Sequence, residues 1–126
     1  MKEITAIIRM DMVGKTRDAL SKAGFPAFTC RKVLGRGKGK VQFVVSNGIN
    51  PLEIQDKAFA EQISENFRLI PKRMFVVVVQ DKDLEKVIDI FMDVNSKGKP
   101  GDGKIFVTDV IDAVRVRTGE RMEIAI

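Results

Sequence analysis

The chain has 126 residues, 44% of them hydrophobic, so it is long enough for one domain with a modest core. Its 22 lysines and arginines outnumber its 17 acidic residues. The resulting net charge of +5 suits anionic partners, although a solvated surface of mixed charge would carry it equally well. The chain has no histidine, which excludes Ser-His-Asp and Cys-His catalysis and histidine metal sites. Its single cysteine, Cys30, permits no intrachain disulfide.

No hydrophobic run reaches the roughly 18 residues of a membrane span, and we expect a cytoplasmic protein.

The first part of the chain predicts a strand, a helix and a second strand. Residues 4–8 form an apolar run rich in β-branched side chains, which is typical of a buried strand. Residues 13–23 have helical apolar spacing, and Gly24 is placed to end that helix. Pro26 breaks the chain, and residues 27–34 predict the second strand.

The last part of the chain predicts a strand, a helix and further strands. Residues 74–80 contain a run of four valines and predict the third strand. A helix follows, with an apolar stripe at Leu84, Val87, Ile88, Phe91 and Met92. Asp81 or Asp83 can cap its start. Strands are expected at 105–107 and at 113–117. The order β-α-β-β-α-β predicts an α+β, ferredoxin-like fold, with an antiparallel sheet and both helices on one face.

Residues 35–73 separate the second and third strands, where an ordinary hairpin uses about 2–5 residues. Within this segment, residues 54–69 carry scattered apolar side chains and can form a short helix. A connection this long inside a small domain is usually functional or disordered. We therefore expect a single domain over residues 1–126 with one long excursion.

Two loops of the sequence alternate glycine with cations. Residues 35–40 read Gly-Arg-Gly-Lys-Gly-Lys, and residues 98–104 read Gly-Lys-Pro-Gly-Asp-Gly-Lys. Glycine lets backbone N–H groups approach a phosphate, and lysine neutralises the phosphate charge. The first loop matches neither a Walker A nor a dinucleotide-binding fingerprint, and flexible surface turns are the alternative for both loops. A ferredoxin-like sheet would bring the two loops together into one phosphate site that includes Lys38 and Lys104.

Arg115 and Arg117 alternate on a predicted strand, so both guanidinium groups should leave the same face. Arginine suits bidentate contact with phosphate, although an exposed edge strand that resists aggregation explains the pair equally well. The carboxylates fall mainly on predicted helix surfaces or turns and mark no catalytic pair. Phosphate-binding loops without a catalytic base predict a sensor rather than an enzyme.

Residues 101–107 read Gly-Asp-Gly-Lys-Ile-Phe-Val, and residues 115–120 read Arg-Val-Arg-Thr-Gly-Glu. Together they resemble the C-terminal motif of the PII family of nitrogen-regulatory signalling proteins. Residues 1–9 look like its first strand, and residues 33–38 look like the root of its long T-loop. Pro71 and Lys72 look like the return into the third strand, which places the T-loop here at about residues 37–70.

The resemblance implies a homotrimer with ATP or ADP bound in clefts between subunits. By position, the nucleotide contacts would be Ile7, Thr29, Gly35, Gly37, Lys38, Gly101, Gly103, Lys104, Arg115 and Arg117. PII proteins also sense 2-oxoglutarate beside a nucleotide-bound Mg²⁺, and the corresponding effector positions are Gly37, Gly39 and Lys72. No metal site made by protein side chains alone is expected.

Three features depart from typical bacterial members. Gly39 replaces the glutamine that coordinates Mg²⁺ and 2-oxoglutarate, there is no tyrosine to uridylylate, and the T-loop is longer. Such a loop resembles PII-like proteins encoded among nitrogenase genes, which act as pairs of different subunits and switch nitrogenase off by binding its dinitrogenase component. This chain looks like the second, longer-loop member of the pair. Its expected partners are further copies of itself or a second PII-like subunit, together with dinitrogenase.

Other functions remain open on the sequence alone. A PII regulator of an ammonium channel or of glutamine synthetase is the first alternative. An RNA-binding ferredoxin-like domain is remote, because the chain has no Trp or Tyr for base stacking, and direct nucleic-acid binding is not expected. An acylphosphatase-like enzyme on the same fold is the last alternative.

The T-loop itself carries the regulatory expectation. We expect residues 41–69 to be mobile in the free protein and ordered on the target, with the ligand at the loop root selecting loop conformations. The alternative is a helix that folds back on its own trimer.

Overall fold

The computed structural model describes residues 1–38 and 69–126. In this part of the chain lie the strands β1 (Lys2–Arg9), β2 (Thr29–Gly35), β3 (Ile70–Val79) and β4 (Gly103–Asp109), and the helices α1 (Val13–Lys22) and α3 (Leu84–Asn95). Short 3-10 turns occupy Met10–Met12, Asp81–Asp83 and Met122–Ala125. None of the described helices is long and apolar enough to cross a membrane.

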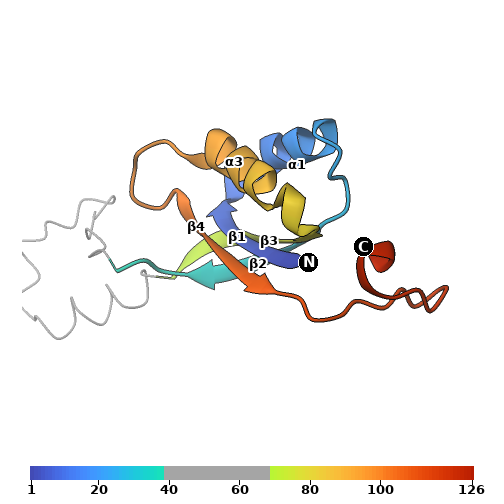
Figure 1. The fold of residues 1–126 in the computed structure, drawn as a ribbon. Helices are drawn as coiled ribbons and strands as arrows, with labels where there is room; N and C mark the ends of the chain where they lie inside the picture. Colours follow the sequence, from blue (N-terminus) through green and yellow to red (C-terminus); the bar gives the residue numbers. More distant parts are fainter. Residues whose placement is uncertain (39–68) are drawn as a thin grey trace, which may run out of the picture.

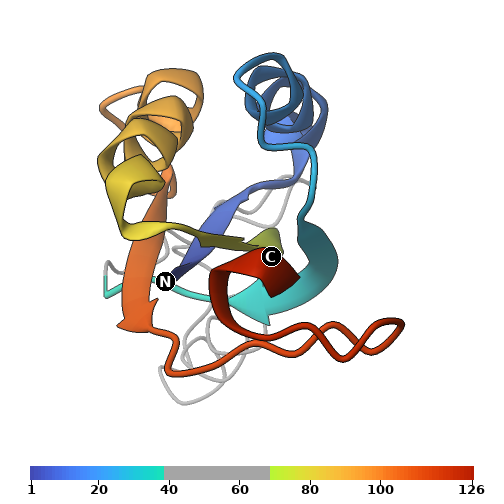
Figure 2. The ribbon, with the colours of Figure 1, turned by 45° about the vertical axis from the view of Figure 1, so that its right-hand side comes forward.

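The four strands form one antiparallel sheet in the order β2-β3-β1-β4. Both helices cover the same face of this sheet (Figure 1, Figure 2). This arrangement confirms the predicted ferredoxin-like α+β fold.

The core follows from the period-two alternation of the central strands. Residues 4, 6 and 8 of β1 and residues 75, 77 and 79 of β3 point toward the helices and are buried. Phe75 is fully buried at the centre of this layer, with its ring 6.0 Å from that of Phe91 in an edge-to-face contact and 5.0 Å from that of Phe28. Burying each such side chain stabilises the fold by about 1.5–3 kcal/mol. The intervening residues, among them Thr5, Ile7 and Val76, lie on the opposite face, which no described helix covers.

Helix α1 ends as predicted. Gly24 adopts a positive φ of 93°, and the N–H groups of Gly24 and Phe25 donate to the carbonyls of Ser21 and Leu20. The two helices also share a buried polar contact, in which the Asn95 amide donates to the Thr16 hydroxyl at 3.2 Å.

Helix α3 differs from the prediction at both ends. The expected side-chain cap is wrong: Asp83 occupies the N-cap position without a capping hydrogen bond. The Asp81 carboxylate instead pairs with the ammonium group of Met1 at 2.9 Å, which lowers the pKa of Asp81. Met92, expected in the apolar stripe, is 48% exposed, while Asn95 is buried.

The strand boundaries also shift. Strand β2 begins two residues later than predicted, and β3 begins four residues earlier, at Ile70. Pairing between β3 and β1 ends at Lys72, so Pro71 has a neighbouring strand on one side only, where it pairs with Leu34 of β2. A proline is tolerated at such an edge position because it has no N–H to donate.

The predicted strand at 113–117 is wrong. Its place is taken by a tight turn in which Gly119 has a φ of 73° and donates its N–H to the carbonyl of Arg115. This turn folds the chain back on itself, so Val114 forms an isolated bridge with Arg121 instead of joining the sheet. The predictions of a helix at 54–69 and of a mobile segment at 41–69 fall, apart from Leu69, outside the described residues.

Candidate phosphate-binding site

The antiparallel sheet brings both glycine-cation loops to one end, which we call the root end. There β1 and β2 finish and β3 and β4 begin, as the pairs Arg9–Lys72, Gly35–Ile70 and Ile8–Gly103 show. Residues 35–38, which follow β2, and the loop 96–102, which precedes β4, leave the sheet at this end (Figure 1). The sequence prediction that the two loops share one end of the sheet is therefore met by the strand order.

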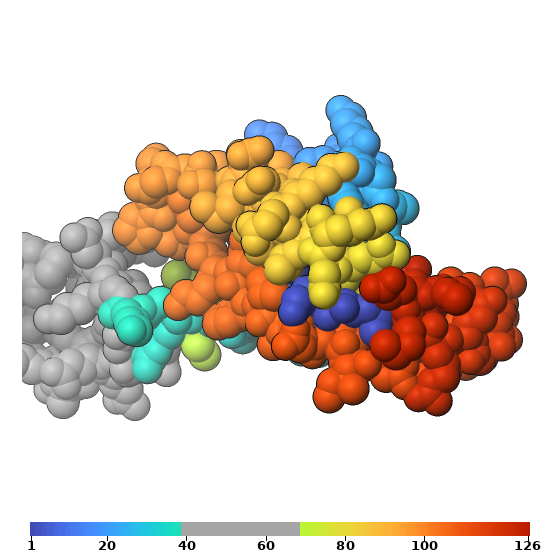
Figure 3. Space-filling model, viewed as in Figure 1, coloured from blue at the N-terminus to red at the C-terminus, as the bar shows by residue number. Residues whose placement is uncertain are grey.

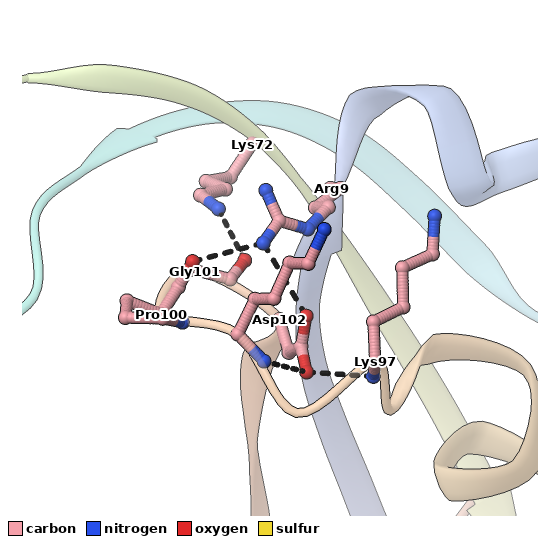
Figure 4. A network of polar contacts seen from close by, with 7 residues as sticks. Arg9, Lys72, Lys97, Pro100, Gly101 and Asp102 are labelled. Atoms are coloured by element: carbon pink, nitrogen blue, oxygen red, sulfur yellow. Dashed lines mark hydrogen bonds and ion pairs between the residues drawn. The ribbon is translucent and has the colours of Figure 1, made fainter.

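The loop 96–102 folds around the carboxylate of Asp102 (Figure 4). This carboxylate accepts hydrogen bonds from the backbone N–H groups of Lys97, at 2.7 Å, and Lys99, at 3.2 Å. The N–H of Asp102 in turn donates to the carbonyl of Lys99 at 3.2 Å. The N–H bonds from Lys97 and Lys99 and the nearby Arg9 lower the pKa of Asp102, so its carboxylate stays ionised at neutral pH.

Arg9 and Lys72, which pair across β1 and β3, tie this loop to the sheet (Figure 4). The Arg9 guanidinium donates through Nη2 to the carbonyl of Pro100 at 2.8 Å and lies 3.3 Å from the Asp102 carboxylate. The Lys72 ammonium donates to the carbonyl of Gly101 at 2.7 Å. Desolvation and, after it, the neighbouring Arg9 charge lower the pKa of Lys72. Two cations, Arg9 and Lys72, thus contact the loop that carries one carboxylate, and the excess positive charge is suited to attract an anion.

Two glycines, Gly101 in the loop and Gly103 at the start of β4, are required by the backbone. Gly101 has a φ of 93°, and Gly103 has a φ of 128°, where other residues are strained. A Cβ at Gly103 would collide with the carbonyl oxygen of Ile7 and lie 3.1 Å from its carbonyl carbon. Gly103 therefore has a packing role in the β1–β4 contact, in addition to the phosphate role predicted from the sequence.

The structure divides the predicted site residues into two groups. The group at the root end comprises Ile7, Gly35, Gly37, Lys38, Lys72, Gly101, Gly103 and Lys104. The second group comprises Thr29, Arg115 and Arg117. Gly39 lies outside the described residues.

The second group lies away from the root end. Thr29 begins β2, six residues from Gly35, which ends it. Arg115 and Arg117 follow β4, in the C-terminal segment that projects from the opposite end of the molecule (Figure 3). Because the predicted strand at 113–117 is replaced by a turn, the two arginines do not share a strand face. Arg115 is held within the segment by Glu120, at 2.6 Å, and by the carbonyl of Ile124, at 2.7 Å. One chain alone cannot bring both groups into a single site.

The sequence prediction missed Arg9 and Asp102. A signal for Asp102 was available, because an aspartate between glycines often accepts N–H groups of its own turn. Arg9 is the last residue of β1 and lies on the face opposite the buried Ile8, as the alternation of the strand requires. The pairing of β1 with β3 places it beside Lys72. The contact with Pro100 depends on the loop conformation, which the sequence did not reveal.

The fold and the glycine loops agree with a comparison against known families. A family model described as nitrogen regulatory protein P-II matches residues 1–120, so the chain belongs to the PII family. Members of this family are non-enzymatic signalling proteins that are typically oligomeric and bind target proteins. The chain is accordingly a regulator and not an enzyme.

Individual relatives narrow the likeness further. The chain is 44% identical over 121 residues, 96% of each chain, to "Nitrogen fixation nifHD region GlnB-like protein 2" of Methanothermobacter marburgensis. It is also 44% identical over 126 residues, 100% of each chain, to the protein of the same description from Methanococcus maripaludis. It is 36% identical over 127 residues to "Nitrogen regulatory protein P-II 1" of Methanothermobacter thermautotrophicus, covering 95% of this chain and 92% of that one.

Proposed function

We propose that this protein is a cytoplasmic, nucleotide- and effector-responsive PII subunit that switches nitrogenase off by binding dinitrogenase through its T-loop. The observation that carries the proposal is full-length similarity to relatives named for the nifHD region, at 44% identity against 36% for a relative named as a general P-II protein. Regulation of an ammonium channel or of glutamine synthetase is the second candidate, and the names of the more similar relatives favour it less.

The proposed assembly is a trimer of this chain or a mixed oligomer with a second PII-like subunit. Residues predicted to touch one nucleotide lie at opposite ends of a single chain, so a complete site requires a second chain. Apolar surface supports this view, because Val116 is 99% exposed and Ile111 is 89% exposed on the projecting C-terminal segment. Phe106 pairs with Thr5 on the sheet face that the described helices leave uncovered, and it is 49% exposed. Exposed apolar surface of this extent is typical of a protein interface.

The proposed ligand is ATP or ADP, and the root end fits its phosphates. Gly103 lets the chain approach the backbone of β1 closely, and Gly101 lies against the Arg9 and Lys72 side chains. Lys38 and Lys104 are exposed at the same end of the sheet. Backbone N–H groups would cradle the phosphates, and the lysines would balance their charge. Arg115 and Arg117 of a neighbouring chain would complete the site.

Replacing either Lys104 or Arg117 with alanine should weaken ATP and ADP binding at least about tenfold. Each charge-assisted phosphate contact contributes roughly 1.5–3 kcal/mol. Calorimetry on the assembled protein measures the effect, with Lys15→Ala, an exposed α1 position, as the control that should bind normally. Wild-type affinity in both Lys104→Ala and Arg117→Ala would show that these residues do not form the nucleotide site.

Binding of the proposed effector, 2-oxoglutarate, would require Lys72 and a Mg²⁺ ion held by the nucleotide phosphates. Lys72 lies beside the glycine loop and carries a cation suited to a carboxylate. Gly39 offers no side-chain oxygen for Mg²⁺, a hard cation that requires an oxygen shell. We therefore propose that this chain alone binds 2-oxoglutarate weakly and that a second PII-like subunit restores the response.

A reconstituted nitrogenase assay tests the function. The purified protein with ATP and the second PII-like subunit should inhibit substrate reduction, and 2-oxoglutarate should relieve the inhibition. Without the second subunit, 2-oxoglutarate should have little effect. Copurification from nitrogen-fixing cells identifies the target directly: recovery of dinitrogenase supports the proposal, whereas recovery of an ammonium channel or glutamine synthetase in its place supports the second candidate.

A further inference from the structure

We propose that Asp102 and Arg9 are a pair of positioning residues that hold the loop 96–102 in its phosphate-binding shape. Asp102 fixes the turn of the loop, and Arg9 fixes that turn to β1. The proposal rests on the proposed nucleotide binding and names the residues that prepare the site for it.

The loop requires such a fixed point because of its glycines. Gly98, Gly101 and Gly103 all have positive φ, at 72°, 93° and 128°. Glycine makes these conformations accessible, but it also gives the loop many other conformations to lose on ordering. The Asp102 carboxylate selects one of them by accepting the N–H groups of Lys97 and Lys99. A loop ordered before the ligand arrives pays less entropy on binding.

Arg9 connects this fixed point to the rigid centre of the sheet. Its Nη2 atom lies 2.8 Å from the Pro100 carbonyl and 3.3 Å from the Asp102 carboxylate, so one nitrogen holds two parts of the loop. The Arg9 and Asp102 side chains are only 30% and 21% exposed, which reduces screening of the ion pair by water. The next residue toward the core, Ile8, pairs with Gly103. The position of the loop is thereby set by β1.

The charge of Asp102 separates a positioning role from ligand contact. An ionised carboxylate only accepts hydrogen bonds, so it repels a phosphate and cannot hold one directly. Arg9 neutralises this charge at the place where the phosphates are expected. A double-mutant cycle distinguishes the action of Arg9 through Asp102 from direct contact of Arg9 with the ligand.

The experiment measures ATP and ADP affinity by calorimetry for Asp102→Ala, Arg9→Met and the double variant in the assembled full chain. Each single change should weaken binding about tenfold, the loss expected when one charge-assisted contact disappears. The double variant should bind no more than about twofold more weakly than the single variant with the lower affinity, because each change alone already releases the same loop from its fixed shape. Asp102→Asn, which keeps one accepting oxygen for the loop N–H groups, should fall between wild type and Asp102→Ala.

A matched control lies at the other ends of the same two strands, where Lys2 of β1 pairs with Asp109 of β4. Asp109→Asn breaks that ion pair and should leave nucleotide affinity unchanged. Backbone amide hydrogen exchange of the nucleotide-free protein supplies a second readout. Exchange at residues 97–103 should accelerate in Asp102→Ala and Arg9→Met, and stay as in wild type in Asp109→Asn.

Normal affinity in both single variants, or losses that add in the double variant, would overturn the proposal. Unaltered exchange at residues 97–103 in Asp102→Ala would overturn it as well. If Asp102→Ala fails to fold, Asp102→Asn and Arg9→Met carry the same cycle. A wild-type protein that binds no nucleotide would defeat the proposed function, whereas the exchange measurement would still decide whether the pair orders the loop.

Discussion

Removing residues 46–65 is expected to abolish inhibition of nitrogenase while nucleotide affinity stays within about twofold of wild type. The deletion keeps the root residues 35–38 and the start of β3, so pairing from Gly35–Ile70 to Thr29–Val76 is retained. Shortening the connection lowers the entropy cost of closing it, and each halving of the loop length favours the folded state by about 0.6 kcal/mol. The removed residues include Ile49, Leu52, Ile54, Phe59 and Ile63, the apolar side chains that we expect to contact the partner.

A glycine-serine segment of the same length in place of residues 46–65 separates the effect of sequence from that of length. Inhibition should be lost in both variants, with assembly and calorimetric nucleotide binding preserved. Normal inhibition by the deletion variant would show that the T-loop is not the contact with the target, and the binding surface would then lie on the body of the assembly.

Replacing Gly103 with alanine is expected to cost about 3–5 kcal/mol of unfolding free energy, a loss in the range of severe single substitutions. The added Cβ would strike the main-chain carbonyl of Ile7, which β1 holds in place between its two neighbouring strands, and the φ of 128° is strained for alanine. Urea unfolding measures the change. The first contacts to fail should be those that join β4 to β1, where Gly103 pairs with Ile8.

Gly14→Ala is the matched control, because Gly14 lies in α1 and a Cβ there would meet nothing within 4 Å. Alanine should stabilise that helix by up to about 0.5–1 kcal/mol. Equal unfolding free energies for Gly103→Ala and wild type would mean that the close approach of β4 to β1 is not required.

The sequence predicted those elements whose cause is local. Strand β1 is predicted by the alternation of its own residues, and β3 by its run of valines. Gly24 ends α1 because its own φ is positive. The failures have a different cause. Residues 113–117 have good strand character, but Gly119 allows a turn a few residues later, and pairing with Arg121 competes with the sheet.

The candidate site was predictable only in part for the same reason. That residues 35–38 and 96–102 meet at one end follows from strand direction, which the order of elements implies. That Asp102 accepts the N–H groups of Lys97 and Lys99, and that Arg9 reaches Pro100, depends on the path of the loop, which has two glycines at positive φ and a third directly after it. Glycine permits many such paths, so composition does not select among them.

Lys104 and the two arginines, Arg115 and Arg117, lie at opposite ends of the molecule, and this placement has a genetic consequence. In the proposed assembly, each cleft combines the loop of one subunit with the arginines of the next. A subunit carrying Lys104→Ala still has intact arginines, and a subunit carrying Arg117→Ala still has an intact loop. In a trimer that contains both variants, the loop of an Arg117→Ala subunit can therefore face the arginines of a Lys104→Ala subunit, and that cleft has the wild-type residues. The two defective alleles would then complement each other within one protein.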